Sequence, residues 1–136
     1  MANTTFSGPV RSENGFEQVT KNATTGAFTV SATYGASITG GVQTLSGAGA
    51  VDLTNLITEL TTGAGAAAVT LANGSTSGQV KIINHIVDGG GTATVTPVTF
   101  ANGTTIAFDA VGESVTLVWN STVGWVATSV NGATVA

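Results

Sequence analysis

Cysteine is absent from this chain of 136 residues, so no disulfide, no thiolate nucleophile and no cysteine-based zinc site can form. Proline occurs only twice, and aromatic residues make up 6% of the sequence. Charge is also scarce, because charged residues account for 7% of the chain, against about 25% in ordinary soluble domains. The solubility of the protein must therefore rest on hydroxyl and amide groups.

Basic residues are especially few. Three of them oppose seven acidic residues, which gives a formal net charge of −4. Three scattered cations cannot form a stripe that neutralises phosphates, so neither nucleic acid nor an anionic membrane is an expected partner. No apolar run approaches the roughly 20 residues of a membrane-spanning helix, and the first residues lack the basic and apolar regions of a secretory signal. We therefore expect a protein that is made in the cytoplasm and is not secreted through a cleaved signal.

Short β-branched and apolar runs fill most of the chain. Apolar residues make up 42% of the sequence, which is enough for a modest core, and the length suits one domain. From Thr24 onward these runs are bounded by Gly and Asn-Gly at spacings of roughly 8 to 12 residues. This pattern predicts an all-β domain over residues 24–136, a small antiparallel β-sandwich or barrel.

The clearest predicted strand covers residues 113–120. Its Val115, Leu117 and Trp119 project to one face, which predicts a core strand. A second strand over residues 124–130 follows after a link of a length that suits a hairpin.

Three further strands are expected. Residues 79–87 alternate with both faces partly apolar, which predicts a central strand. Residues 92–100 and 104–108 complete the set, and Pro97 predicts that the first of these lies at an edge or bends there. The dipeptide Asn131-Gly132 favours a tight turn into the C-terminal tail.

Residues 51–60 leave two alternatives open. Apolar residues from Leu53 to Leu60 fall at the spacing of a helix face. The many threonines and the following Gly63-Ala64-Gly65 oppose a helix, and the surroundings are rich in β signals. A strand or an irregular segment is favoured, and a short helix is the alternative.

One internal similarity occurs between residues 71–76 and residues 100–105, which share an Ala-Asn-Gly core. Two copies in a chain rich in Thr and Gly do not establish a duplication. We interpret them as similar hairpin turns.

The single histidine, His85, is the first candidate for chemistry. It lies on the predicted strand 79–87 near Asp88, where it would serve as a general base or a metal ligand. The chain has no second histidine and no cysteine to complete such a site. We therefore favour a strand histidine that is exposed or packed at a subunit contact.

The acidic residues form no recognisable site either. None of their spacings matches a calcium-binding loop. The run Asp88-Gly89-Gly90-Gly91 is the most site-like element, but no helix follows to make it a phosphate cradle. Glu113 is expected to face solvent before its strand, and no Gly-x-Ser-x-Gly motif is present. The sequence therefore predicts no catalytic residue, no metal and no cofactor.

Two tryptophans, Trp119 and Trp125, lie on consecutive predicted strands. If both faced solvent they would form a platform on which a carbohydrate could stack, whereas inward-facing rings would anchor the core. We favour the core or an interface, because large aromatic side chains dominate burial in a small β domain.

Residues 1–23 differ from the rest of the chain. Four of the ten charged side chains fall in the first 21 residues, where little hydrophobic period is present. Gly-Pro and Asn-Gly pairs disfavour helix and predict an extended or looped arm. An arm with so little apolar content exposes its aromatic residues unless a partner supplies a pocket, so we predict a docking strap for a neighbouring subunit or a larger surface. Its predicted contact residues are Phe6, Pro9, Arg11, Glu13 and Phe16.

These segments also carry a family resemblance. Residues 6–16 resemble the N-termini of small β-rich structural proteins that decorate the capsid exterior of tailed bacteriophages. Residues 71–83, 100–108 and 112–125 are similar to a module that is common in phage head and fibre proteins. The chain thus resembles the capsid decoration, or head cement, proteins.

The resemblance implies a structural virion protein on the capsid exterior that stabilises the shell by bridging major capsid subunits. Such proteins are commonly homotrimers at local threefold positions, and they bring no catalytic residues and no cofactor. An alternative is a tail-fibre or head-fibre module that binds a host receptor or glycan, which predicts outward-facing Trp119 or Trp125. A small polysaccharide-active enzyme is the third possibility, and it would need His85 and a carboxylate within hydrogen-bonding reach in one pocket.

Overall fold

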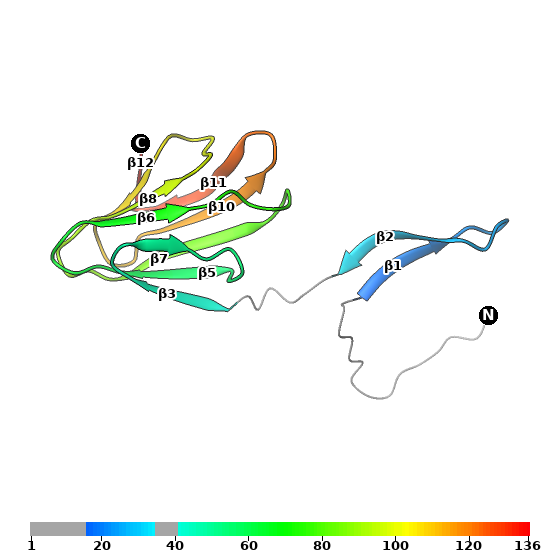
Figure 1. Ribbon diagram of the computed structural model, residues 1–136, viewed down its shortest axis with the longest axis horizontal. Helices are drawn as coiled ribbons and strands as arrows, with labels where there is room; N and C mark the ends of the chain where they lie inside the picture. The colour runs from blue at the N-terminus through cyan, green and yellow to red at the C-terminus, as the bar shows by residue number, and fades with distance from the viewer. Residues whose placement is uncertain (1–15, 35–40) are drawn as a thin grey trace, which may run out of the picture. The chain divides into compact units, whose positions relative to one another are not determined.

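A computed structural model describes residues 16–34 and 41–136 of the protein (Figure 1). The chain divides into two compact units, residues 1–38 and residues 39–136. The described residues form twelve strands and no helix, so the prediction of an all-β fold is confirmed. In that part of the chain, no helix is long and apolar enough to cross a membrane.

The described part of the first unit is a hairpin of β1 (Phe16–Lys21) and β2 (Phe28–Tyr34), which pair antiparallel. Its turn is closed by the side chain of Asn22, whose Oδ1 accepts hydrogen bonds from the backbone N–H groups of Thr24 and Thr25. Gly26 supplies the positive φ of 72° that the turn requires. The boundary at residues 23 and 24, which the sequence predicts between arm and domain, thus lies within this turn.

The second unit contains ten strands in two five-stranded sheets. Sheet I has the order β11-β10-β7-β5-β3, and sheet II has the order β12-β9-β8-β6-β4. The strands are β3 (Val42–Ser46), β4 (Gly49–Val51), β5 (Ile57–Thr61), β6 (Ala67–Leu71), β7 (Val80–Val87), β8 (Ala93–Pro97), β9 (Ile106–Phe108), β10 (Ser114–Asn120), β11 (Gly124–Asn131) and β12 (Thr134–Val135).

The chain winds between the two sheets in three rungs, each made of one strand of sheet I and the next strand in sheet II. The rungs are β3–β4, β5–β6 and β7–β8, and equivalent strands of successive rungs pair parallel. The strands β9 to β12 then close the unit with antiparallel pairs. The sheets are therefore mixed, and they do not close into a barrel, so the antiparallel part of the predicted fold class is wrong.

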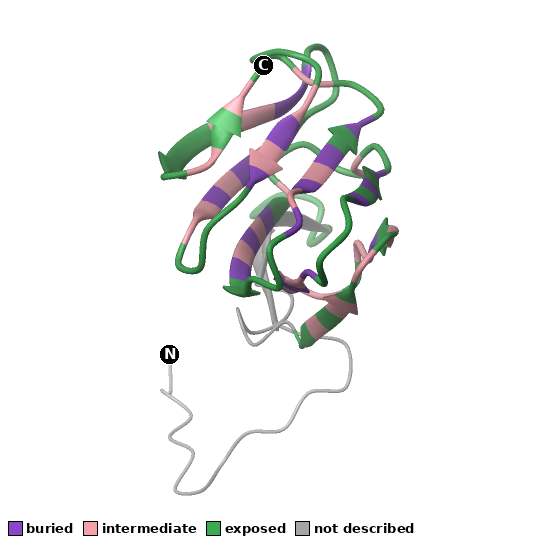
Figure 2. Cartoon of the chain, turned by 90° about the vertical axis from the view of Figure 1, so that its left-hand side faces the viewer, coloured by how far each residue is buried: buried purple, intermediate pink, exposed green. Residues whose placement is uncertain are grey.

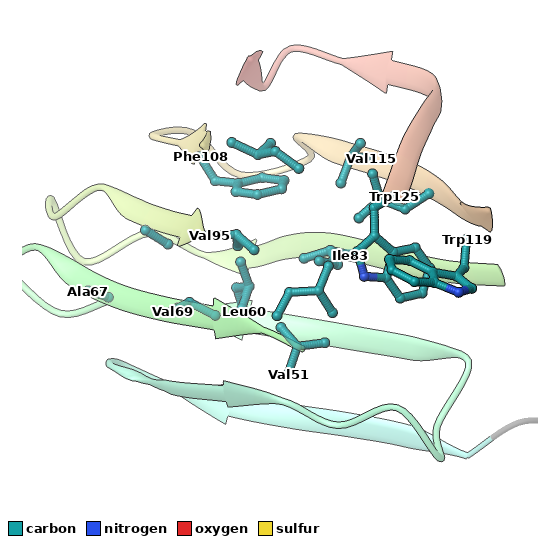
Figure 3. Packing of buried hydrophobic residues seen from close by; sticks show 14 residues of the cluster. Val51, Leu60, Ala67, Val69, Ile83, Val95, Phe108, Val115, Trp119 and Trp125 are labelled. Carbon is teal, nitrogen blue, oxygen red and sulfur yellow. The ribbon is translucent and has the colours of Figure 1, made fainter. Parts of the chain in front are cut away.

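The core lies between the two sheets. Along the strands, buried residues alternate with half-buried or exposed ones, as Figure 2 shows by its bands. Trp119 and Trp125 pack inside with ring centroids 5.4 Å apart in an edge-to-face arrangement (Figure 3). Trp125 is fully buried, and its Nε1–H donates to the carbonyl of Ala72 at 2.8 Å. The prediction that the tryptophans belong to the core is confirmed.

Glycines allow successive rungs to stack at one corner of the unit. A Cβ atom on Gly89 would collide with the carbonyl of Thr62, and one on Gly91 would collide with the carbonyls of Gly63 and Gly65. The glycine run after β7 is therefore required by backbone packing against the corner of the preceding rung.

The predicted strands are recovered with shifted ends. Residues 79–87 correspond to β7, which is central as expected, because β5 and β10 flank it. The hairpin from β10 to β11 is confirmed. Residues 51–60 contain an irregular segment and then β5, so the preferred alternative to a helix is confirmed.

Of the two alternatives for Pro97, the edge position is wrong, because β8 lies between β6 and β9, whereas the bend is confirmed, because β8 ends at Pro97 and residues 98 and 99 form a bend. The N–H of Val98 donates to Leu71 of β6, so the nitrogen of Pro97 points toward β9. Pairing between β8 and β9 ends at Val95. The absence of an N–H group at Pro97 therefore removes no hydrogen bond between these strands.

The two Ala-Asn-Gly segments occupy different connections. Asn102-Gly103 lies in the hairpin between β8 and β9, whereas Asn73-Gly74 connects β6 in sheet II to β7 in sheet I. Only the second segment along the chain is therefore a hairpin turn. Asn131-Gly132 forms a turn with a positive φ at Gly132, but it leads into β12 of the opposite sheet.

Candidate functional site

The predicted contact residues of the arm fall largely outside the described residues. Phe6, Pro9, Arg11 and Glu13 lie in residues 1–15, and Phe16 begins β1, where only the backbone is described. Their role in docking stays a prediction.

His85 is buried inside the second unit and is neither exposed nor at the surface for a subunit contact. Its Nδ1–H donates to the carbonyl of Ala110 at 3.0 Å, since a carbonyl can only accept. Its Nε2 lies 3.2 Å from the hydroxyl of Thr62. The imidazole therefore ties β7 both to the end of β5 and to the connection between β9 and β10.

Asp88 does not contact His85 directly. Its Oδ1 accepts from the hydroxyl of Thr62 at 3.3 Å and from the N–H of Gly90 at 2.7 Å. This chain of contacts links the corners of the second and third rungs. Among residues 16–34 and 41–136, no three side chains of His, Cys, Asp or Glu gather into a group that could hold a metal.

Glu113 is half-buried, and its carboxylate is also engaged in local hydrogen bonds that the sequence did not predict. Its Oε2 accepts hydrogen bonds from the N–H groups of Asp109 at 2.7 Å and Ala110 at 3.2 Å. The carboxylate thus closes the turn between β9 and β10.

Lys81 is the buried polar group that the sequence analysis missed. It is 1% exposed near the start of β7, and its Nζ donates to the carbonyls of Asp52 at 2.6 Å and Asn55 at 2.7 Å. Beside it, the amide of Gln79 donates to the carbonyl of Leu53 at 3.1 Å. These side chains fix the irregular segment between β4 and β5. The sequence does contain an indication that Lys81 is buried, because Lys81 shares a strand face with the apolar Ile83.

Burial and hydrogen bonding shift two pKa values in this cluster. Burial lowers the pKa of Lys81 from 10.5 to about 8, although the charge of Asp52 opposes the shift. Hydrogen bonds from the hydroxyl and the backbone N–H of Thr54 lower the pKa of Asp52 from its ordinary 3.8. Since Lys81 is enclosed by backbone carbonyls, its role is to hold the fold.

The outer face of sheet I is apolar over one half. Six Val and Ile side chains from the five strands form two rows across neighbouring strands, on the face opposite the buried residues. Val42 is 52% exposed and Val80 is 39% exposed, and the other members are half-buried. We call this group the apolar face of sheet I; it consists of Val42, Ile57, Val80, Ile82, Val118 and Val126.

The outer face of sheet II has a different composition. Its outward-facing strand residues are all threonine or alanine, and none carries a large apolar side chain. They are Ala50, Ala68, Thr70, Thr94, Thr96, Ala107 and Thr134. The unit therefore has one face suited to water and one face with a concentrated apolar area, which is typical of a surface that meets a partner.

The sequence predicts only part of the apolar face of sheet I. Alternation along residues 79–87 already gave both faces of β7 apolar character. Which neighbouring strands add to the outer face depends on the parallel pairing of the rungs, and the sequence did not predict this pairing. A comparison with known proteins finds no matching family and no matching curated protein.

Proposed function

We propose that the chain is a structural virion protein that binds the outside of a phage capsid and stabilises the shell by bridging major capsid subunits. The observation that supports this proposal is the difference between the outer faces of the two sheets. Val42, Val80 and their neighbours place apolar side chains on the outer face of sheet I, and sheet II presents only threonine and alanine. The buried centre of a protein interface is more apolar than the rest of the surface, so the apolar face is the one that would lie toward the shell.

The proposal assigns two contacts to the chain. The apolar face of sheet I lies on the shell, and the arm of residues 1–21 is a strap that binds an adjacent capsid subunit or another copy. Many such contacts act together, so weak individual binding favours the assembled shell by mass action. No reaction and no cofactor belong to this role, and association into a homotrimer at threefold positions is the arrangement that the resemblance implies.

The test is co-sedimentation with emptied heads of the phage that encodes the chain. Val80→Lys places a charge in the apolar face of sheet I and should lower the occupancy on heads strongly, because the charge would have to be desolvated. Thr96→Lys adds the same charge to the outer face of sheet II and should leave the occupancy unchanged. Equal occupancy for the two variants would refute the assignment of the binding face.

The arm is tested in the same assay. Deletion of residues 1–21 should abolish docking while the unit of residues 39–136 stays folded, as measured by its tryptophan fluorescence and thermal transition. Unchanged occupancy of the shortened chain would show that the arm is not a docking strap.

A fibre module that binds a receptor or glycan is the second candidate. Its expected aromatic platform is contradicted, because Trp119 and Trp125 are buried. Winding in stacked rungs would still suit a segment of a fibre. That candidate gains support if the chain fails to bind heads and binds host cells instead.

A further inference from the structure

The outer edge of β3 has an unpaired set of backbone groups. The N–H of Gly47 donates to the carbonyl of Thr61 on β5, so Gly47 turns its backbone groups toward β5. The backbone N–H and C=O groups of successive residues point to alternate sides of a strand. Val42, Thr44 and Ser46 therefore turn these groups away from β5. No strand within residues 16–34 and 41–136 pairs with this edge.

The neighbouring edge, that of β4, is closed by a side chain. The amide of Gln43 reaches across the end of the first rung, where its Nε2 donates to the carbonyl of Ala50 at 2.9 Å. Its Oε1 accepts from the N–H of Asp52 at 2.8 Å. One glutamine thus satisfies two of the backbone groups that a further strand would use.

The remaining edges of the two five-stranded sheets are also protected. Along β11, Trp125 exchanges hydrogen bonds with Thr99 and Ala101, and the N–H of Ala127 donates to the side chain of Asn102. A register shift then interrupts the second half of β11, and β12 is only two residues long. Bulges and short edge strands are devices that oppose pairing with other chains.

The edge of β3 carries none of these devices. Residues 41–51 contain no charged residue and no proline, and Val42 is 52% exposed. Natural sheets usually place a charge or a proline on a long exposed edge to prevent strand addition. A regular uncharged edge, in a pair of five-stranded sheets whose other edges are blunted, is suited to receive a strand.

We propose that a second copy of this chain pairs with this edge, β3 against β3 in antiparallel register about a twofold axis at Thr44. The outward residues 42, 44 and 46 are symmetric about Thr44, so Val42 meets Ser46 of the other copy and Thr44 meets Thr44. Every outward N–H and C=O of one strand then finds its complement on the other. The pair joins the two copies of sheet I into one continuous sheet and covers the half-buried Leu45 at the end of each core.

Charge does not oppose this pairing. Glu59 lies beside Thr44 on the neighbouring strand and is the charged residue on this face of β5. In the pair, the two copies of Glu59 are separated by three strand spacings, about 14 Å. This separation exceeds the screening length of about 8 Å at physiological salt, so their repulsion is weak.

This contact goes beyond the proposed function and is compatible with it. A twofold contact through β3 leaves the apolar face of sheet I available to the shell, and a threefold contact elsewhere on the molecule would be unaffected.

Amide hydrogen exchange of the full chain tests the proposal at residue resolution. Gln43 and Leu45 donate toward β5, so their amides should be protected at every protein concentration. The amides of Val42, Thr44 and Ser46 should exchange fast in dilute solution and slow by roughly tenfold or more as the concentration rises. Fast exchange at all concentrations would overturn the proposal, and so would protection that is already complete in dilute solution, because the edge would then be covered within one chain.

Variants at Thr44 supply the second test. Thr44→Pro removes the outward N–H without removing a bond to β5, and Thr44→Lys places two like charges at the twofold axis. Both should halve the native mass that light scattering measures at high concentration, whereas the control Thr44→Val should keep it. If the mass of both variants equals that of the unmodified chain, or if concentration-dependent doubling occurs without protection of the three outward amides, the second copy does not bind at β3.

Discussion

Replacing Lys81 by methionine should change how the stability of the protein depends on pH. Lys81 is almost fully buried, and its Nζ donates to the carbonyls of Asp52 and Asn55. Burial lowers its pKa from 10.5 to about 8 in the folded protein. The unfolded chain therefore holds this proton between pH 8 and pH 10.5, and the folded chain does not.

The sign and the size of the effect follow from this difference. Where the unfolded state binds more protons, the free energy of unfolding rises with pH. A shift from 10.5 to about 8, at 1.36 kcal/mol per unit, gives a gain of at most about 3 kcal/mol across the window. The neutral amine still has two hydrogens for the two carbonyls, so the gain is not offset by lost hydrogen bonds. Below pH 8, Lys81→Met removes a desolvated charge but leaves two carbonyls unpaired, at about 1–3 kcal/mol each.

The assay is urea unfolding of the unmodified chain and of Lys81→Met at pH values from 7 to 10.5. The free energy of unfolding of the unmodified chain should rise relative to that of Lys81→Met as the pH increases. Lys21→Met is the matched control, because it removes the other lysine of the chain and should leave the pH dependence unchanged. Parallel curves for the unmodified chain and Lys81→Met would refute the reasoning.

Three further predictions concern the packing of the second unit. Gly91→Ala should lower the thermal stability by about 2 kcal/mol, because the new Cβ would collide with the carbonyl of Gly65, whereas Gly63→Ala has open space and should change it little. Gln43→Ala should cost about 1–3 kcal/mol in denaturant unfolding, since it leaves edge groups of β4 and a buried threonine hydroxyl without their partner. Trp125→Ala should cost about 3–5 kcal/mol, as measured by chemical denaturation, and an unchanged stability would show that this ring lies outside the core.

The sequence predicted the strands with strong alternation and missed how they pair. Residues 113–120 and 79–87 show period-2 patterns that local reasoning detects, and β10 and β7 follow them closely. Parallel pairing of β3, β5 and β7 arises because each strand is followed by one in the opposite sheet. Nothing within a single strand records that connection, so the antiparallel prediction failed.

The sequence contains a pattern that marks the stacked corners, but a search for a repeat of constant length does not detect it. Each rung turns at a Gly-x-Gly segment, at residues 47–49, 63–65 and 89–91. The spacing between these segments is unequal because both the strands and the connections at the other corner differ in length. In the third segment, Gly89 and Gly91 are required because a Cβ atom on either residue would collide with the backbone of the preceding corner.

The structure describes only some of the residues that the sequence predicts for the functional site. The contact residues from Phe6 to Glu13 lie outside the described residues, and the apolar face of sheet I required the strand order before it could be assembled. Burial of His85 and Trp125 depends on their strands being flanked or covered by segments that are distant in sequence. Such contacts lie beyond the reach of local pattern analysis.

The most direct test of the proposed function is a cryo-electron microscopy reconstruction of phage heads incubated with the full chain. The account predicts density for the β unit on the outer surface of the shell, with the apolar face of sheet I toward the capsid subunits and sheet II toward solvent. Bare heads at saturating protein concentration, or bound protein with sheet II toward the shell, would contradict it.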